Sequence, residues 1–288
     1  MATARDLQRQ INTVKNQARV FSALQTVSSV KFRKAEARVK KARPYAENVE
    51  QMMSDVADSD SGDLPLLTGR EVRRVAICTL TADRGLAGGF NAQVLRRTVR
   101  LRNEKDQDAL QVASGRKAVA FFRFRRVELA EVFTGFTDNP TYEKAREIGS
   151  TLTNLFDDEE ADEVYLVYNR FESALNQRPV VKRLLPVAEE GDEEEEEKNG
   201  ASYMEYVPDA ETVLKRLVPR YVETMVWQAL LEGAAGEHGA RMTAMKNATD
   251  NANDLVRDLT LQMNKARQAQ ITQEILEIVG GAEALSAG

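Results

Sequence analysis

The residues whose spacing comes closest to a chemical motif are 83–91, which read DRGLAGGFN between a predicted strand and a predicted helix. A glycine-rich turn in that position can present backbone N–H groups to a phosphate. The segment lacks the GxxxxGK[ST] pattern of a P-loop, and GLAGG does not match the GxGxxG of dinucleotide-binding folds. We therefore interpret it as a tight turn that needs glycine backbone angles, with nucleotide binding as the alternative.

The other reactive side chains form no catalytic pattern. His238 and Cys78 are the only histidine and the only cysteine, so neither has a neighbour of its own kind with which to share a metal ion. The acidic run 157–160 ends a predicted helix and is typical of a solvated helix end. Because no nucleophile is paired with a base, the sequence predicts no catalytic residue, no metal ligand and no cofactor.

Charge and hydropathy exclude two further classes of protein. The formal net charge of −5 over 288 residues gives no basic field that would attract nucleic acid. No apolar run approaches the roughly 20 residues that a membrane-spanning helix needs, and the N-terminus has no apolar signal core. We expect a chain with no nucleic-acid partner and no direct membrane span, which stays where it is made and reaches a membrane only through another protein.

A long N-terminal helix is predicted over residues 1–57, which contain no glycine and one proline, Pro44. Mostly apolar residues in this stretch follow one another in alternating steps of four and three, which is the heptad repeat of a coiled coil. The repeating positions are Leu7, Ile11, Val14, Ala18, Phe21, Gln25, Ser28, Phe32, Ala35, Val39, Ala42, Ala46, Val49, Met53 and Val56. Because proline costs about 3 kcal/mol inside a helix, we expect a kink or break at residues 41–45.

A second long helix is predicted over residues 209–285, with Asp209 as its N-cap. Its seam is predicted at Met245, Ala248, Ala252, Leu255 and Leu259, and beyond it apolar residues occupy several faces. The three glycines within residues 233–239 predict weakness or bending. This helix is longer than the first by roughly 20–25 Å. Its apolar tip would be exposed in a free monomer, so we expect other subunits to surround it.

Strand and helix patterns alternate over residues 70–190. Strands are predicted at 72–81, 109–113, 127–133, 163–171 and 178–187, and helices at 92–103, 116–123 and 141–156. This alternation is typical of a Rossmann-like α/β domain with a mostly parallel sheet. Both long helices join this central domain, one entering and one leaving. The predicted fold class is therefore α/β, with the terminal helices forming a long antiparallel two-helix coiled coil.

Four segments of the chain resemble the gamma subunit of F-type ATP synthase. They are ARPYAENV at 42–49, DRGLAGGFN at 83–91, ARMTAMKNATDNA at 240–252 and NKARQAQITQEILEIVGGAEAL at 264–285. The resemblance covers essentially the whole chain in the same order. The chain departs from the family pattern at Ala87, where cysteine is usual, and at GEHGARM, where SEHAARM is usual. No cysteine-bearing regulatory insert is visible, so thiol switching is not expected.

The resemblance implies the rotary central stalk of a proton- or sodium-translocating ATP synthase. Such a shaft couples ion flow through a membrane c-ring to ATP synthesis in the catalytic beta subunits, and it has no catalytic site of its own. The implied partners are the alpha and beta subunits of the catalytic hexamer, the epsilon subunit and the c-ring. The implied location is the cytoplasmic side of a bacterial cell membrane, as a peripheral subunit.

The resemblance also implies contact residues. Near the tip, the polar positions that meet a beta-subunit loop match Arg267, Gln268 and Thr272. On the first helix, the positions that face the beta subunit match Leu24, Lys31 and Arg33. In the foot beside the c-ring and the epsilon subunit, the positions match Tyr203, Glu205 and Tyr206. For each residue the alternative is an ordinary exposed position of a helix or loop.

Two other functions stay open at the level of sequence. One is a static coiled-coil scaffold or tether, and the other is a nucleotide-binding enzyme built on the α/β domain. Copurification with one copy per three alpha and three beta subunits separates a shaft from a tether. Titration of the isolated chain with ATP or NAD separates a shaft from an enzyme.

Overall fold

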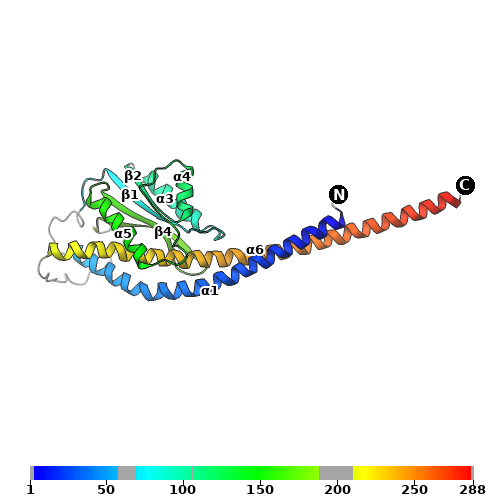
Figure 1. Cartoon of the computed structure of the whole chain (residues 1–288), viewed down its shortest axis with the longest axis horizontal. Coiled ribbons are helices and arrows are strands. Elements are labelled where there is room, and N and C mark those ends of the chain that lie inside the picture. The colour runs from blue at the N-terminus through cyan, green and yellow to red at the C-terminus, as the bar shows by residue number, and fades with distance from the viewer. Residues whose placement is uncertain (1–2, 58–68, 106, 188–209, 287–288) are drawn as a thin grey trace. The chain divides into compact units, whose positions relative to one another are not determined.

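The computed structural model describes residues 3–57, 69–105, 107–187 and 210–286 (Figure 1). The chain forms two compact units, one made of Met1–Val27 with Met242–Gly288 and the other of Ser28–Arg241. These two units cut across both long helices and so divide the chain differently from the predicted ranges 1–57, 70–190 and 209–285. Each unit is described by itself.

The second unit is built on a five-stranded sheet with the order β3-β2-β1-β4-β5. Its strands are β1 (Arg74–Leu80), β2 (Asp108–Ser114), β3 (Glu131–Phe133), β4 (Glu163–Phe171) and β5 (Gln177–Leu185). The first four run parallel, and only β5 is antiparallel to its neighbour β4. Six of the seven residues of β1 are buried, as expected for a parallel strand covered on both faces. The predicted mostly parallel sheet is confirmed.

Helices cover both faces of this sheet. The short helices among the described residues are α3 (Phe90–Glu104), α4 (Arg116–Phe124) and α5 (Tyr142–Asp157). On one face, Val75 and Ile77 of β1 pack with Val94 of α3, and Ala113 of β2 packs with α4. On the other face, the alternate residues of the strands pack with α5 and with segments of both long helices. The second unit is therefore three-layered.

The N-terminal helix α1 (Ala4–Ala57) is continuous. Every predicted seam position from Leu7 to Met53 is buried or half-buried, and the burial of Val56 lies outside the described side chains. The break predicted at residues 41–45 is wrong, because the helix runs through Pro44. Pro44 itself is exposed, whereas Ala42, Ala46 and Val49 beside it pack into the core. This packing offsets the hydrogen bond that proline cannot make.

The C-terminal helix α6 (Ala210–Ser286) is also continuous, and Asp209 lies outside the described residues. The helix runs without interruption through residues 233–239, where weakness or bending was predicted, and two of the glycines there permit close packing. A Cβ atom at Gly236 would lie 2.9 Å from the ring of Phe90, and one at Gly239 would lie 3.2 Å from the carbonyl of Ala174. The missing side chains bring α6 against its neighbours.

In the first unit, the N-terminal turns of α1 run antiparallel to the C-terminal part of α6 (Figure 1). Buried positions there include Leu7, Ile11 and Ala18 of α1 and Met245 and Ala252 of α6. The prediction that Leu255 belongs to the seam is wrong, because its side chain is 47% exposed. The half-buried residues that continue the seam are Val256, Leu259, Met263 and Ala266.

Candidate subunit interface

The far part of α6 in the first unit is exposed on every side. From Arg267 to Ala282, the last residue whose burial is described, each side chain is exposed. The large apolar side chains in this stretch are Ile271, Ile275, Leu276, Ile278 and Val279, which are 47–72% exposed. Exposed apolar patches of this kind are typical of surfaces that bind another protein or a membrane. We call residues 267–282 the α6 tip.

The predicted contacts Arg267, Gln268 and Thr272 all lie on the α6 tip. Thr272 Oγ1 donates a hydrogen bond to the carbonyl of Gln268 at 3.0 Å, which holds the hydroxyl against the helix. Within the described part of the chain, the side chains of Arg267 and Gln268 make no hydrogen bond or ion pair. Their polar groups therefore face outward from the helix.

The other predicted contacts are distributed over the chain. Leu24 is half-buried in the first unit. Lys31 and Arg33 belong to the second unit, where Arg33 is exposed and Lys31 forms an ion pair with Asp138 at 2.5 Å. The foot residues Tyr203, Glu205 and Tyr206 lie outside the described residues.

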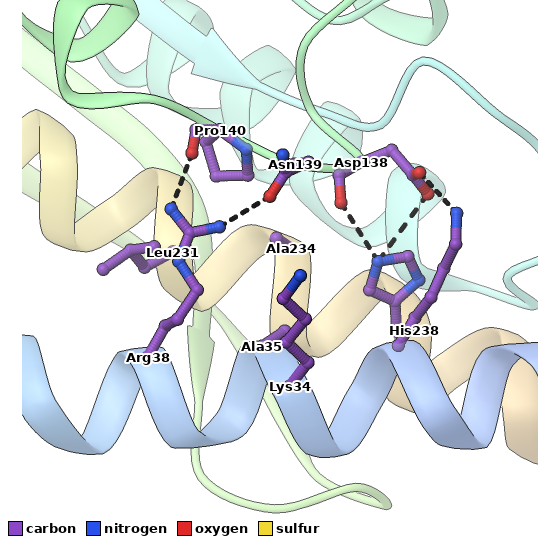
Figure 2. Close-up of a pocket in the computed structure, with 10 residues that line it drawn as sticks. Lys34, Ala35, Arg38, Asp138, Asn139, Pro140, Leu231, Ala234 and His238 are labelled. Carbon is purple, nitrogen blue, oxygen red and sulfur yellow. Dashed lines mark hydrogen bonds and ion pairs between the residues drawn. The ribbon is translucent and has the colours of Figure 1, made fainter.

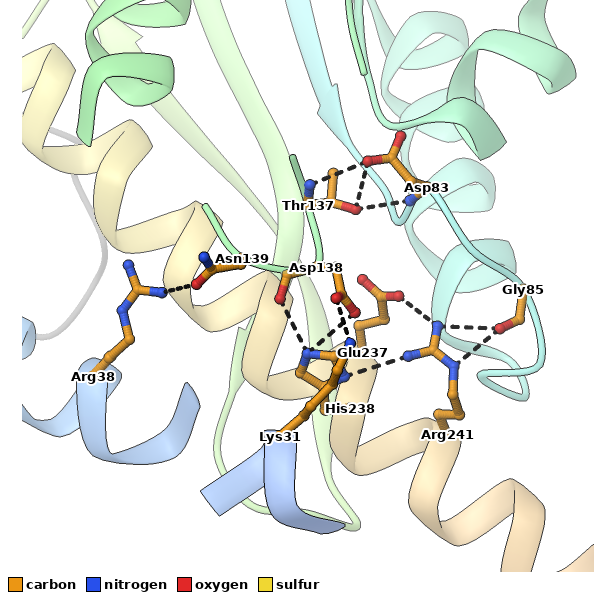
Figure 3. Close-up of polar contacts among 10 residues, drawn as sticks. All are labelled: Lys31, Arg38, Asp83, Gly85, Thr137, Asp138, Asn139, Glu237, His238 and Arg241. Carbon is orange, nitrogen blue, oxygen red and sulfur yellow. Dashed lines mark hydrogen bonds and ion pairs between the residues drawn. The ribbon is translucent and has the colours of Figure 1, made fainter. Parts of the chain in front are cut away.

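Sequence patterns did not predict a polar cluster in the second unit (Figure 3). It begins at Asp83, which follows β1. The Asp83 carboxylate accepts hydrogen bonds from the backbone N–H groups of Arg116, Gly135 and Thr137 at 2.9–3.1 Å. Burial works against ionisation of Asp83, but these bonds outweigh it and lower the pKa of the carboxyl. The Asp83 carboxylate thus ties the segment after β1 to the backbone of residues 116, 135 and 137.

Asp138 joins both long helices to the segment between β3 and α5. Its carboxylate accepts the bond from Lys31 of α1, and its backbone carbonyl lies 3.2 Å from Nε2 of His238 on α6. Because a carbonyl can only accept, Nε2 carries the proton, and Nδ1 is left to accept from Arg241 at 3.4 Å. Burial lowers the pKa of His238, so the neutral ring is favoured.

Arg241 connects α6 to the glycine-rich turn. Its guanidinium donates to the carbonyl of Gly85 from Nε at 3.2 Å and from Nη2 at 3.1 Å. It also pairs with Glu237, whose pKa is raised by burial despite the bond from Arg241. Leu86 and Gly88 have φ angles of 63° and 53°. The prediction that this segment is a tight turn with glycine backbone angles is therefore confirmed.

A small cavity lies between α1, residues 138–140 and α6 (Figure 2). Arg38 closes one side of it by donating to Asn139 Oδ1 at 2.8 Å and to the carbonyl of Pro140 at 2.7 Å. The cavity volume is about 120 Å³, whereas pockets for nucleotide-sized ligands hold about 300–1,000 Å³. This cavity is therefore too small for a nucleotide.

A second cavity, of about 490 Å³, is lined by the charged residues Arg70, Glu71, Arg73, Arg74, Asp108, Glu159, Glu160 and Asp162. It lies where β1, β2 and β4 begin, whereas open α/β sheets bind ligands outside the carboxyl ends of their strands. Asp162 is already paired with Arg70. Among the residues that the structure describes, no cluster of three or more His, Cys, Asp or Glu could hold a metal ion. The described helices likewise include none able to cross a membrane.

Comparison with known sequences gives matches over the whole chain. A family model described as ATP synthase matches residues 3–285. The chain is 68% identical over 291 residues to the ATP synthase gamma chain of Rubrobacter xylanophilus, and 100% of each chain is covered. It is 45% identical over 289 residues to the ATP synthase gamma chain of Desulfitobacterium hafniense, covering 99% of this chain and 100% of the relative.

Solved structures share the fold. A chain from the Euglena gracilis mitochondrial ATP synthase (OSCP/F1/c-ring, rotational state 3) matches with a TM-score of 0.70 and 18% identity, over 99% of this chain and 95% of that chain. A chain from the central stalk and c-ring of the Tetrahymena thermophila mitochondrial ATP synthase matches with a TM-score of 0.61 and 20% identity, over 80% and 99%. With sequence relatives that match from end to end, the chain belongs to the family of ATP synthase gamma chains.

Proposed function

We propose that this chain is the rotating central shaft of an ATP synthase. It couples the flow of protons or sodium ions through a c-ring to ATP synthesis in the beta subunits, and the catalytic groups belong to those subunits. Its proposed partners are the alpha and beta subunits of the catalytic hexamer, the epsilon subunit and the c-ring. Its proposed location is the cytoplasmic side of a bacterial cell membrane, which it reaches through these partners.

The observation that carries the proposal is the bare α6 tip. A helix that leaves Ile275, Leu276 and Ile278 more than half exposed would be prone to aggregate as a free monomer. A sleeve of alpha and beta subunits around the tip covers these side chains in the proposed assembly. A shaft inside such a sleeve presents a different helix face to each beta subunit, and each orientation favours one set of nucleotide affinities.

The size of the transmitted energy suggests how the load is carried. Moving one charge through 100 mV is worth about 2.3 kcal/mol, so several ions per ATP deliver on the order of 10 kcal/mol. One exposed ion pair is worth only about 0–1 kcal/mol. No single side chain carries that load, and the torque is distributed over the stiffness of α1 and α6 and over many contacts.

We assign the beta-subunit contacts to Arg267, Gln268 and Thr272 on the α6 tip. The outward polar groups of Arg267 and Gln268 support this assignment, since they are available to a partner. The further contacts that we assign to the beta subunits are Leu24, Lys31 and Arg33. The contacts that we assign to the c-ring and the epsilon subunit are Tyr203, Glu205 and Tyr206.

Native mass measurement of the complex purified through a tag on this chain tests the proposal. We expect one copy of the chain with three alpha and three beta subunits. A free homodimer would support a static tether, and saturable binding of ATP to the isolated chain would support an enzyme. Either result would overturn the shaft.

The double variant Arg267→Ala with Gln268→Leu tests the proposed contacts on the α6 tip. We expect weaker assembly or slower ATP-driven ion pumping with the fold of the isolated chain intact, because both side chains are exposed. The control is Lys265→Ala with Gln262→Leu, which makes the same kinds of change at exposed positions on the same helix. Pumping equal to that of the control would contradict the assignment.

A further inference from the structure

Three segments of the second unit that are far apart in sequence meet at Asp138 (Figures 2 and 3). Lys31 of α1 lies 107 residues from Asp138 along the chain, and His238 of α6 lies 100 residues from it. Lys31 binds the carboxylate, and His238 Nε2 lies 3.2 Å from the backbone carbonyl and 3.6 Å from Oδ1 of the same carboxylate. One residue between β3 and α5 therefore holds both long helices.

A second contact fixes α1 on the same segment. Arg38 follows Lys31 by seven residues, so the two side chains project from the same face of the helix. Arg38 binds Asn139 and Pro140, the two residues that follow Asp138. Two cations on one helix face, each bound to the same short segment, resist both rotation of α1 about its axis and sliding along it.

The segment that receives these bonds is itself anchored to the sheet. Asp83, three residues after the end of β1, binds the N–H groups of Gly135 and Thr137 and the Thr137 hydroxyl. The hydroxyl in turn accepts the N–H of Asp83 at 2.8 Å. On the same side, Arg241 of α6 binds the carbonyl of Gly85. Residues 83–85 and 135–140 thus form a polar layer between the carboxyl ends of the strands and the two helices.

Apolar packing and these bonds act together on the position of α1. The seam of α1 in the second unit has alanine at 35, 42 and 46 and larger side chains at Phe32, Val39 and Met53. A shift of one heptad exchanges alanine for alanine only between 35 and 42. Polar groups at a helix seam can also fix its register. Directional bonds to Asp138 would be broken by the same shift.

We propose that Asp138, with Lys31 and His238, is a positioning clamp that sets the register of α1 and α6 on the α/β domain. Torque then passes between the domain and the helices without slip. The inference rests on the proposed function, because slip matters only in a rotating shaft. Asp138 acts here through the helices that it holds and not by touching a nucleotide.

Coupling measured in the complete complex tests the clamp. The complex is reconstituted in vesicles with Asp138→Asn or with Lys31→Met, and ATP hydrolysis and ATP-driven ion uptake are measured on the same sample. We expect the ratio of uptake to hydrolysis to fall by about fivefold, on the scale of one charge-assisted hydrogen bond, with hydrolysis retained. The matched control is Asp108→Asn, which removes an ion pair to Arg74 in which both side chains are exposed.

The charge swap, Lys31→Asp with Asp138→Lys, separates positioning from loss of a beta-subunit contact at Lys31. We expect the swap to restore most of the ratio, since it rebuilds the ion pair in reverse. Single variants that pump like the Asp108→Asn control would overturn the clamp. Where the single variants fail to assemble, the swap decides: assembly with pumping supports the clamp, and a swap as defective as the single variants overturns it. Failure of the wild-type chain to copurify with the hexamer would instead contradict the proposed function.

Discussion

His238 contacts Asp138 from α6, and the protonation state of its ring affects this contact. The neutral ring donates through Nε2 to Asp138 and accepts through Nδ1 from Arg241. A second proton on the ring would place an N–H group against the guanidinium of Arg241, which has no acceptor to offer. Burial already lowers the pKa of the ring below its ordinary value of 6.5, against the pull of Asp138. Acid should therefore loosen this contact.

The free energy of unfolding should report this loosening. Below about pH 6.5 the unfolded chain protonates His238 while the folded chain does not, so stability falls as the pH is lowered. His238→Gln removes the titration and keeps a donor and an acceptor. We therefore expect urea unfolding to show a smaller loss of stability from about pH 7.5 to about pH 5.5 in the variant than in the wild type.

Titration of the other charged groups around His238 would not produce this difference in pH dependence between wild type and variant. Asp138 has a pKa below its ordinary 3.8, so its stabilising charge is present above that pH and lost only in stronger acid. Glu237 has a raised pKa and favours the folded state as the pH falls, which is the opposite sign. The cations beside this cluster are Lys31, Arg84 and Arg241, which the wild type and the variant share. Equal slopes for wild type and variant would contradict the account of His238.

Local sequence patterns predict little of the hydrogen bonding around His238 and Asp83. His238 has no second histidine or cysteine near it in the sequence, so no metal pattern was predicted there and its role was left open. Asp138 lies 100 positions from His238, and Arg116, Gly135 and Thr137 lie 33–54 positions from Asp83. No local pattern reports such distances. The turn at residues 83–91 was predictable because glycine spacing is a local property of the backbone.

At the scale of elements, the glycines of α6 provide a paired test. Gly236 is packed against the buried ring of Phe90, so Gly236→Ala must push that ring aside. We expect a loss of about 1–3 kcal/mol in the free energy of unfolding, as for overpacking of a core. Gly233 has no heavy atom within 4 Å of the position its Cβ would take, among the residues described. Gly233→Ala should gain about 0.5–1 kcal/mol from helix propensity.

Both variants are compared by urea unfolding of the full-length chain. If Gly236→Ala lowers the free energy of unfolding and Gly233→Ala raises it, the effect of packing is distinguished from that of helix propensity. A neutral or stabilising Gly236→Ala would show that α6 does not need the close approach to Phe90. The comparison needs no partner subunit, so it tests the fold alone.

The elements differ in how far their sequence determined them. The seam of α1 was predictable throughout the described side chains, because one heptad register persists from Leu7 to Met53. The seam of α6 was misplaced between Leu255 and Val256, since adjacent apolar residues leave the choice to the partner helix. The disruptive effect of Pro44 was overestimated for a related reason. A proline inside a helix costs a few kcal/mol, and packing along a long helix can offset that cost.

At the scale of the whole molecule, we expect the α6 tip to matter for assembly and coupling but not for the folding of the isolated chain. Deleting residues 271–288 removes side chains that are exposed wherever their burial is described. We expect an unchanged melting temperature for the isolated chain, because little described packing is lost. In the complex we expect weaker assembly or a lower ratio of ion uptake to ATP hydrolysis, with beta-subunit chemistry retained. A truncated chain that couples like the full one would contradict the proposed bearing.

The sequence could supply the architecture of the whole molecule but not its partners. Alternation of strands and helices and the two heptad seams follow from the chain's own physics, and they predicted the α/β fold. The partners entered only through resemblance to a family. An exposed apolar tip shows that something covers it, but the contact residues of an absent protein leave no periodic signal.

Rotation of this chain inside the catalytic hexamer is the central claim, and a bead attached to the chain observes it directly. Cys78 is buried and its pKa is raised to about 12, so it should not react with a thiol label. Phe124 is 88% exposed, and Phe124→Cys in a cysteine-free hexamer offers a single attachment point. With the hexamer fixed to a surface and ATP added, the account predicts continuous rotation of the bead in one direction, with three pauses per turn. A bead that only wobbles while ATP is hydrolysed would contradict it.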